Sequence, residues 1–280
     1  MLASSSAQVP PAGQVAVACA APRRKLTIVI PCFNERDTVL DVIERVKSVP
    51  VDKFIVVVDN ASTDGTRELL RSVCTNERES ATPGVARDAD TFPGQSMLDG
   101  DGFTVVLQPK NLRKGTSIKA GLALANSEYL ICQDADLEYD PRDILRLLEH
   151  ADNTGVSAVF GSRLKEPSRL RFDLFHLGRV ALTKLFCGLY GYSITDVATC
   201  YKLMRTDVAR SLDMQSAGFD LDFEIPAKLA RLKHSVAELP VSYTPRGSSG
   251  GKKLRWRDGF GAAWTLVRLR VSRPRVAPSM

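Results

Sequence analysis

The sequence predicts an α/β protein whose mostly parallel sheet is covered by helices on both faces. Short apolar runs recur between Leu26 and Phe160, and most are followed by a stretch in which apolar residues repeat at helical spacing. The runs are continuously apolar instead of alternating, which is typical of strands buried on both sides. Strands that alternate with helices in this way favour a parallel sheet.

Each element follows from a local pattern. Strands are expected at 26–30, 54–58, 103–107, 129–132 and 158–160. Helices are expected at 39–46, 66–73, 118–125 and after Asp140-Pro141, where a capping residue precedes proline at the first helical position. Beyond Gly161 the pattern is less regular, and it indicates helices at 172–190 and 221–232 and strands at 197–204 and 236–243.

The composition divides the chain into three parts. Residues 1–24 are rich in Ala, Ser and Pro and are expected to form a disordered tail. One domain should cover 25–250, with the polar, Gly- and Pro-bearing segment 76–102 inserted as a long surface loop. Residues 251–280 form a basic amphipathic segment. The net charge of +6 fits an anionic ligand or surface, although a charge of this size also serves solubility.

Cysteine usage and hydropathy indicate a cytoplasmic protein. None of the six cysteines is spaced C-x-x-C and no histidine lies near them, so we expect reduced thiols and no zinc site. No stretch reaches the roughly 18 to 20 uninterrupted apolar residues that span a bilayer. The N-terminus also lacks the basic and apolar regions of a signal peptide.

Polar residues follow three of the predicted strands. Asp134 and Asp136 come directly after the fourth, and ligands of open α/β sheets bind at such strand ends. Two carboxylates there can bind Mg²⁺ or Mn²⁺, with Glu138 as a third ligand. An ion in that position would neutralise a diphosphate leaving group. Asn34 with Glu35, and Asp59 at the next strand, would face the same crevice, although turns and helix caps also use these residue types.

The order of these motifs resembles family 2 glycosyltransferases. The matching segments are Val-Ile-Pro-Cys-Phe-Asn-Glu at 29–35, Val-Asp-Asn-Ala-Ser-Thr-Asp-Gly-Thr at 58–66, Asn-Leu-Arg-Lys-Gly at 111–115 and Asp-Ala-Asp at 134–136. A narrower similarity to dolichol- and polyprenyl-phosphate sugar synthases rests on 160–163, 196–202, 218–224 and 243–246 followed by 251–253. The resemblance implies the GT-A fold, in which a Rossmann-like nucleotide half is fused to a smaller acceptor-side region.

The resemblance also implies residue roles. Pro31, Phe33, Asn34 and Glu35 would line the nucleotide, Asp59 would bind the base, and Lys114, Asp134 and Lys202 would contact substrate. Asp134, Asp136 and Glu138 would hold the metal, and Arg163, Arg246 and Lys252 would hold phosphates. Glu138 stands where lipid-phosphate mannosyltransferases often carry Gln, so the sugar, and the choice between a GDP- and a UDP-linked donor, stay open.

The acceptor can be considered independently of the resemblance. A lipid monophosphate has its second pKa near 6 and is already an anion at neutral pH. Inverting transfer to it needs positioning and cations, for which Arg163, Arg205 and Arg246 are available, with Asp136 and Asp222 as further catalytic candidates. A hydroxyl acceptor would instead need a general base, for which Asp222 or Glu224 is the candidate.

The C-terminal segment carries an aromatic stripe. Trp256, Phe260, Trp264, Val267 and Val271 recur at helical spacing among eight basic residues between Lys252 and Arg275. Such a helix either lies on an anionic membrane surface or packs on the body of the protein, and the sequence leaves both open. We expect a peripheral enzyme on the cytosolic membrane face. The rival classes are a glycan-modifying transferase and a non-catalytic lipid- or nucleic-acid-binding protein, but no nucleic-acid partner is expected.

Overall fold

The computed structural model describes residues 24–79, 95–165, 174–245 and 256–272. Their centre is one nine-stranded sheet with the order β3-β4-β5-β2-β1-β6-β8-β7-β9. The strands are β1 (Arg24–Cys32), β2 (Lys53–Asp59), β3 (Cys74–Glu79), β4 (Ser96–Gly100), β5 (Phe103–Leu107), β6 (Ser127–Cys132), β7 (Ala158–Ser162), β8 (Lys202–Arg205) and β9 (Val236–Pro240). The neighbours β5, β2, β1 and β6 run parallel, as expected from their apolar runs.

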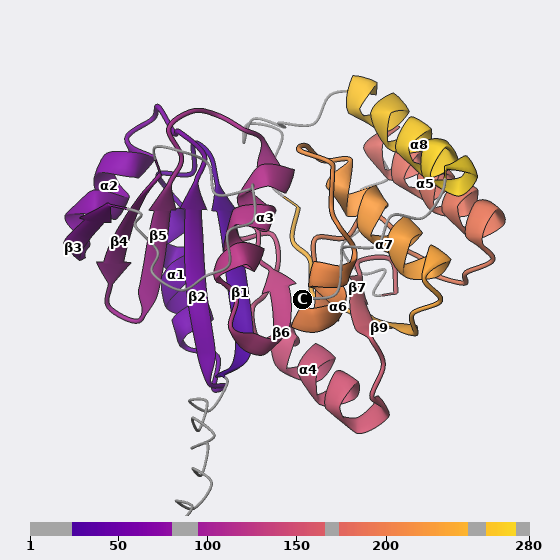
Figure 1. Ribbon diagram of the computed structural model, residues 1–280, viewed down its shortest axis with the longest axis horizontal. Helices are drawn as coiled ribbons and strands as arrows, with labels where there is room; N and C mark the ends of the chain where they lie inside the picture. The colour runs from indigo at the N-terminus through magenta and orange to yellow at the C-terminus, as the bar shows by residue number, and fades with distance from the viewer. Residues whose placement is uncertain (1–23, 80–94, 166–173, 246–255, 273–280) are drawn as a thin grey trace, which may run out of the picture.

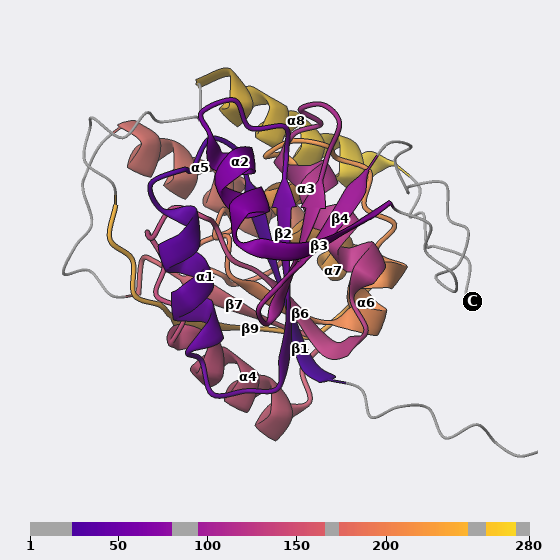
Figure 2. The same cartoon turned by 90° about the vertical axis from the view of Figure 1, so that its left-hand side faces the viewer.

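Helices cover both faces of the sheet. They are α1 (Val39–Lys47), α2 (Thr66–Ser72), α3 (Lys114–Leu124), α4 (Asp143–Thr154), α5 (Leu174–Tyr190), α6 (Thr206–Ser211), α7 (Leu221–Arg231) and α8 (Trp256–Val271). Seen along the sheet, α1 lies on one side and α6 on the other (Figure 2). Helices α5, α7 and α8 pack together beside the β7–β9 end of the sheet (Figure 1). No helix in the described ranges is long and apolar enough to cross a bilayer.

Burial in the core explains why the sequences of the parallel strands are continuously apolar. Leu26, Ile28, Val29 and Ile30 of β1 are completely buried because helices cover both faces of the strand. Helix α3 approaches β1 so closely that a Cβ on Gly121 would lie 2.4 Å from a Val29 methyl group. This close approach holds the N-terminus of α3 over the carboxyl ends of the strands.

The sheet is mixed: β5, β2, β1 and β6 run parallel to one another, as do β7 and β9, and the other strand pairs are antiparallel. Strands β6 and β8, β7 and β8, β3 and β4, and β4 and β5 are antiparallel. The expected strand at 197–204 shortens to β8, and the one at 236–243 ends at Pro240. Because β8 runs against β6, residues at the beginning of β8 and not those at its end lie near the carboxyl end of β6.

The prediction of a loop over 76–102 is wrong at both of its ends. Strands β3 and β4 form an antiparallel hairpin that extends the sheet beside β5, and Leu98 of β4 is buried. The polar composition misled the prediction because an edge strand keeps one side in water and can carry charged residues. The middle of this segment, 80–94, lies outside the described residues, as does the expected tail up to residue 23.

Candidate active site

Four strand ends meet at one edge of the sheet and carry the predicted polar residues. The loops that follow β1, β2, β5 and β6 each contain a non-glycine residue with positive φ, namely Asn34 (54°), Ala61 (59°), Arg113 (71°) and Leu137 (60°). Such backbone conformations cost energy outside glycine and concentrate at binding sites. The strain indicates that these turns are held in place by their surroundings to present particular groups.

Hydrogen bonds tie the loops after β1 and β2 together. Asn34 accepts a bond from the Thr63 amide at 2.8 Å through its side chain, and its own amide donates to Ser62 Oγ at 2.9 Å. The Glu35 amide donates to Thr66 Oγ1 at 3.0 Å. The polar residues at 31–35 and 59–65 are therefore brought together as expected, and Asn34 contributes by joining the two loops.

Asp59, which the resemblance assigned to the base, lies at the end of β2 in an ion pair. Its side chain is completely buried, and its Oδ2 accepts a hydrogen bond from Arg67 Nε at 2.6 Å. Oδ1 accepts one from the Ser62 amide at 3.2 Å. Arg67 also donates to the Gln108 carbonyl at 2.5 Å, so this ion pair links the ends of β2 and β5. Arg67 was not recognised in the sequence because it lies within an ordinary helix.

A lysine–aspartate network lies where these strand ends meet. Lys114, the first residue of α3, places its Nζ 2.8 Å from Asp134 Oδ1 and 3.6 Å from Asp222 Oδ2. Lys202 approaches the other oxygen of Asp222 at 3.7 Å and donates to the Thr199 carbonyl. These side chains come from α3, the β6 end, β8 and α7, so four predicted substrate-contacting or catalytic residues are brought together by the fold.

The charges in this network shift the pKa values of its members. Burial alone would raise the pKa of Asp134, but Lys114 outweighs it and holds this pKa below the usual range. Burial likewise opposes the charge of Lys114, and the two carboxylates raise its pKa well above normal. For Lys202, burial prevails over the attraction of Asp222 and lowers the pKa. Opposite charges thus keep Lys114 and Asp134 ionised in the crevice.

The three predicted metal ligands do not form one cluster. Asp136 turns back to accept the Glu138 amide at 3.2 Å, and Glu138 Oε2 accepts a hydrogen bond from Tyr243 at 2.7 Å. The left-handed turn at Leu137 separates the two carboxylates. Within the described ranges, the trio of potential ligands close enough to share an ion is Cys132, Asp134 and Cys200. Glu138 therefore holds Tyr243 in the segment that follows β9.

A second cationic region lies beside the network. Arg163, just after β7, donates from Nε to Asp196 Oδ2 at 2.6 Å and from Nη2 to Oδ1 at 2.8 Å. Its guanidinium carbon lies 5.9 Å and 5.3 Å from the ring centres of Tyr139 and Tyr243. Burial opposes its charge, but Asp196 raises the pKa of Arg163 well above normal.

Arg179 of α5 belongs to the same region and was missed in the sequence. Burial lowers its pKa, and repulsion by Arg163 lowers it further, so the two guanidiniums are electrostatic neighbours. Only the tertiary fold brings Arg179 within electrostatic range of Arg163. The one signal in the sequence was an arginine within an otherwise apolar helix.

Four further candidate residues lie outside the lysine–aspartate network or outside the described residues. Arg205 is not in the crevice: it pairs with Tyr129 near the beginning of β6 and forms an ion pair with Asp207 at 2.8 Å. The alternative base Glu224 is completely buried and accepts the amides of Gln215 and Ser216 at 2.8 and 2.6 Å, with Lys228 at 2.6 Å. Arg246 and Lys252 lie outside the described residues.

Comparison with known proteins identifies the family of this protein. The family model for glycosyl transferase family 2 matches residues 27–212. The chain is 25% identical over 264 residues to polyprenol monophosphomannose synthase of Mycolicibacterium smegmatis, covering 91% of each chain. It is 24% identical to the low-salt glycan biosynthesis hexosyltransferase Agl6 of Haloferax volcanii, and there it covers 87% of this chain but only 52% of that protein.

Solved structures show the same fold. Glucosyl-3-phosphoglycerate synthase of Mycobacterium tuberculosis in complex with UDP superposes with a TM-score of 0.62 at 17% identity, covering 88% of this chain and 80% of that one. Its complex with Mn²⁺, UDP and glucosyl-3-phosphoglycerate gives 0.60. The protein is a glycosyltransferase with the GT-A fold that its motifs predicted. The chain belongs to glycosyl transferase family 2.

Proposed function

We propose that the enzyme transfers a sugar from a nucleotide-diphosphate donor to a phosphate-bearing lipid of the polyprenyl or dolichyl type. The observation that carries the acceptor is the cationic region at Arg163, whose guanidinium lies against the rings of Tyr139 and Tyr243 and is repelled by the charge of Arg179. Two like charges that repel each other are both stabilised when a phosphate lies between them. The similarity to a polyprenol monophosphomannose synthase supports the same acceptor.

The donor would occupy the strand-end crevice. Pro31, Phe33 and Glu35 would line its β1 side, and Asp59 with its partner Arg67 would provide a charged end for the base or ribose. Both UDP and GDP donors remain candidates, and the UDP complexes of the structural neighbours support UDP. Lys114 at the start of α3 is placed to contact a diphosphate, because the amide groups and the positive end of a helix N-terminus favour anions.

Asp134 and Asp136 fit a hard divalent ion through their carboxylate oxygens, and the Mn²⁺ complexes of the structural neighbours support Mg²⁺ or Mn²⁺ as cofactor. When bound, such an ion neutralises charge on the diphosphate leaving group. Glu138 is bound by Tyr243, so Asp134 and Asp136 are the residues that would hold the ion. Lys114 would move from Asp134 to the diphosphate as the donor binds.

The phosphate acceptor would attack without a general base. Its oxygen is already anionic, so the chain has to orient it and screen its charge. Direct displacement by this oxygen inverts the configuration at the sugar carbon. Asp222, which lies between Lys114 and Lys202, would then orient the two ammonium groups and would not remove a proton.

A hydroxyl acceptor is the second candidate, because Asp222 also has the position of a base in the crevice. One structural neighbour was solved with phosphoglyceric acid, so acceptors other than lipids occur within this fold. The discriminating experiment supplies labelled nucleotide sugars with a polyprenyl phosphate or with the matched free polyprenol. Label entering organic solvent with the phosphate alone supports the proposal. Transfer to the alcohol or to a soluble glycan would show instead that the acceptor is a hydroxyl group.

Helix α8 supports attachment to an anionic membrane surface. It uses one face, including Ala262, Leu266 and Leu269, to pack on the body of the protein. The other face leaves Phe260 and Trp264 exposed at 70% and 66%. One face of α8 therefore packs on the protein, and the proposed membrane contact would use the other face.

The exposed face has the composition of a membrane contact. Val267 and Val271 continue it, and Arg268 and Arg270 accompany it in the last turn. Aromatic side chains with neighbouring arginines are typical of helices that lie in the lipid headgroup region. Helix α5 packs against α8 and carries Arg179, while its exposed Leu177 lies two residues away. A lipid acceptor held with its chain in the membrane would thus present its phosphate beside Arg179.

A further inference from the structure

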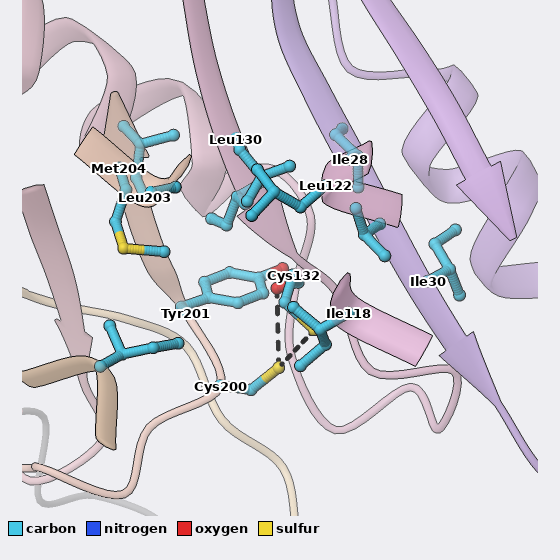
Figure 3. Packing of buried hydrophobic residues seen from close by; sticks show 14 of the residues in the cluster. Ile28, Ile30, Ile118, Leu122, Leu130, Cys132, Cys200, Tyr201, Leu203 and Met204 are labelled. Atoms are coloured by element: carbon cyan, nitrogen blue, oxygen red, sulfur yellow. Dashed lines mark hydrogen bonds between the residues drawn. The ribbon is translucent and has the colours of Figure 1, made fainter. Parts of the chain in front are cut away.

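Two cysteines that are 68 residues apart meet below the crevice. Cys132 ends β6, and Cys200 lies just before β8. Their sulfur atoms are 3.5 Å apart, and Cys200 also lies 3.6 Å from the Cys132 carbonyl oxygen (Figure 3). The antiparallel pairing of β6 with β8 brings them together, which is why cysteine spacing in the sequence argued against such a pair.

A carboxylate completes the group. One oxygen of Asp134 and the two sulfur atoms all lie within 4.8 Å of one another. Cys132 and Cys200 are 8% and 4% exposed, whereas the side chain of Asp134 is 23% exposed and connects the group to the crevice. The cluster therefore has two sheltered sulfur atoms and one solvent-facing oxygen.

We propose that Cys132, Cys200 and Asp134 form a binding site for a thiophilic divalent ion such as Zn²⁺. Two sulfur ligands at about 2.3 Å in a tetrahedral site are roughly 3.8 Å apart, close to the separation that the thiols already have. Asp134 closes the remaining distance by rotating its carboxylate away from Lys114. Water or a donor oxygen takes the fourth position.

The ligand types decide which ion is bound. Sulfur selects Zn²⁺ or Cd²⁺ over Mg²⁺ and Mn²⁺, which prefer oxygen. The divalent ion replaces the two thiol protons, which pass to solvent, so the total charge of the cluster is unchanged. A buried group can accept the ion without the cost of adding net charge.

Occupation of this site by Zn²⁺ would affect the transfer reaction. This effect rests on the proposed function, whereas the site itself does not. Asp134 cannot orient toward the sulfur atoms and also serve the ion that accompanies the donor. Binding of the thiophilic ion therefore competes with the hard ion, and Zn²⁺ inhibits transfer in a way that a higher Mn²⁺ concentration relieves. The cluster would make the enzyme sensitive to free zinc.

Direct binding is tested with Cd²⁺, whose bonds to thiolates give an ultraviolet charge-transfer band. The full-length protein should show one saturating site. Cys132→Ala and Cys200→Ala should each lose about half of the band, because intensity follows the number of cadmium–sulfur bonds, and the double variant should lose all of it. Cys74→Ala, which changes a half-buried cysteine on β3, is the matched control and should behave as wild type. A wild-type band in the double variant overturns the proposal.

A second measurement is independent of variant folding. X-ray absorption of the wild-type protein loaded with one Zn²⁺ should show two sulfur ligands at about 2.3 Å together with oxygen at about 2.0 Å. A shell of oxygen and nitrogen alone overturns the site. If the protein binds Zn²⁺ through two sulfur atoms but has no transferase activity, the metal site is confirmed and the proposed function is wrong.

Discussion

Arg163 and Asp196 form a buried bidentate ion pair. The guanidinium donates at 2.6 and 2.8 Å to the two oxygens of a completely buried carboxylate, and the Arg163 amide donates at 3.2 Å. Arg163 thus combines a structural role with its place beside Arg179. Substitution of Arg163 alone therefore cannot separate lost acceptor binding from lost folding.

The first prediction concerns stability. Arg163→Met should lower the free energy of unfolding by roughly 3 to 5 kcal/mol, because Asp196 is left charged and buried. Arg163→Lys, which keeps the charge, should lose less. Urea unfolding near neutral pH measures both. If Arg163→Met unfolds at the same urea concentration as wild type, the pair does not stabilise the fold.

The same pair predicts a pH dependence. Burial would raise the pKa of Asp196, but Arg163 holds it below its usual value, so ionised Asp196 stabilises the fold above its unfolded pKa near 3.9. This stability is lost as the pH falls below about 3.9 through the depressed folded pKa. In Arg163→Met the loss should begin at a higher pH. Circular dichroism measured during acid unfolding compares wild type with Arg163→Met. Unfolding of both proteins over the same pH range would contradict the stabilising role of the Arg163–Asp196 pair.

The second prediction tests the acceptor site. Arg179→Gln should lower kcat/KM for a phosphate acceptor by about one to two decades, corresponding to a charge-assisted contact of roughly 1.5 to 3 kcal/mol. The loss should fall mainly on the acceptor KM when the donor is saturating. Lys184→Gln removes an exposed charge from the same helix and serves as the control. Equal kinetics in the two variants would exclude Arg179 from the site.

The third prediction separates Asp222 from Glu224. With a phosphate acceptor, folded Asp222→Asn should retain activity within about tenfold of wild type, whereas loss of a general base would cost about two to four decades. Glu224→Gln should act on stability instead, by roughly 1 to 3 kcal/mol, because it weakens buried hydrogen bonds to two amides and Lys228. A folded, inactive Asp222→Asn together with a nearly normal Arg179→Gln would favour the hydroxyl acceptor.

The fourth prediction concerns the metal. Asp136→Asn should abolish turnover and remove the dependence of nucleoside-diphosphate affinity on Mg²⁺ or Mn²⁺. Its fold should persist, because Asp136 is only half-buried. Calorimetry with and without a chelator measures the effect, and Asp140→Asn, outside the crevice network, is the control. Wild-type affinity that is equal in both conditions would show that donor binding needs no ion.

The fifth prediction concerns the membrane. Trp264→Ser should weaken binding to phosphatidylglycerol vesicles by at least about tenfold, since burying a large apolar side chain contributes roughly 1.5 to 3 kcal/mol. Val73→Ser changes an exposed apolar residue on another part of the surface and should have no effect. Co-sedimentation supplies the measurement. If Trp264→Ser instead dissolves a dimer seen in ultracentrifugation and leaves vesicle binding unchanged, a second copy of the chain covers this face.

The sequence by itself determined the alternation of strands and helices, because the apolar period is local and continuous burial leaves continuous apolar runs. It also placed Asn34, Asp59 and Asp134 at strand ends, and the parallel topology then brought those ends to one edge. The hairpin β3–β4 escaped prediction because an edge strand is not required to be apolar on both sides.

Tertiary structure alone decided which distant groups meet. The charge of Arg179 acts on Arg163 only because of how α5 packs against α7 and α8, and Cys200 reaches Cys132 only because β8 runs antiparallel to β6. Tertiary packing also separated the two faces of α8, which local periodicity could describe but not assign to protein or solvent. Contacts between residues far apart in the chain depend on strand order and direction, and a periodic pattern along one segment carries no information about either.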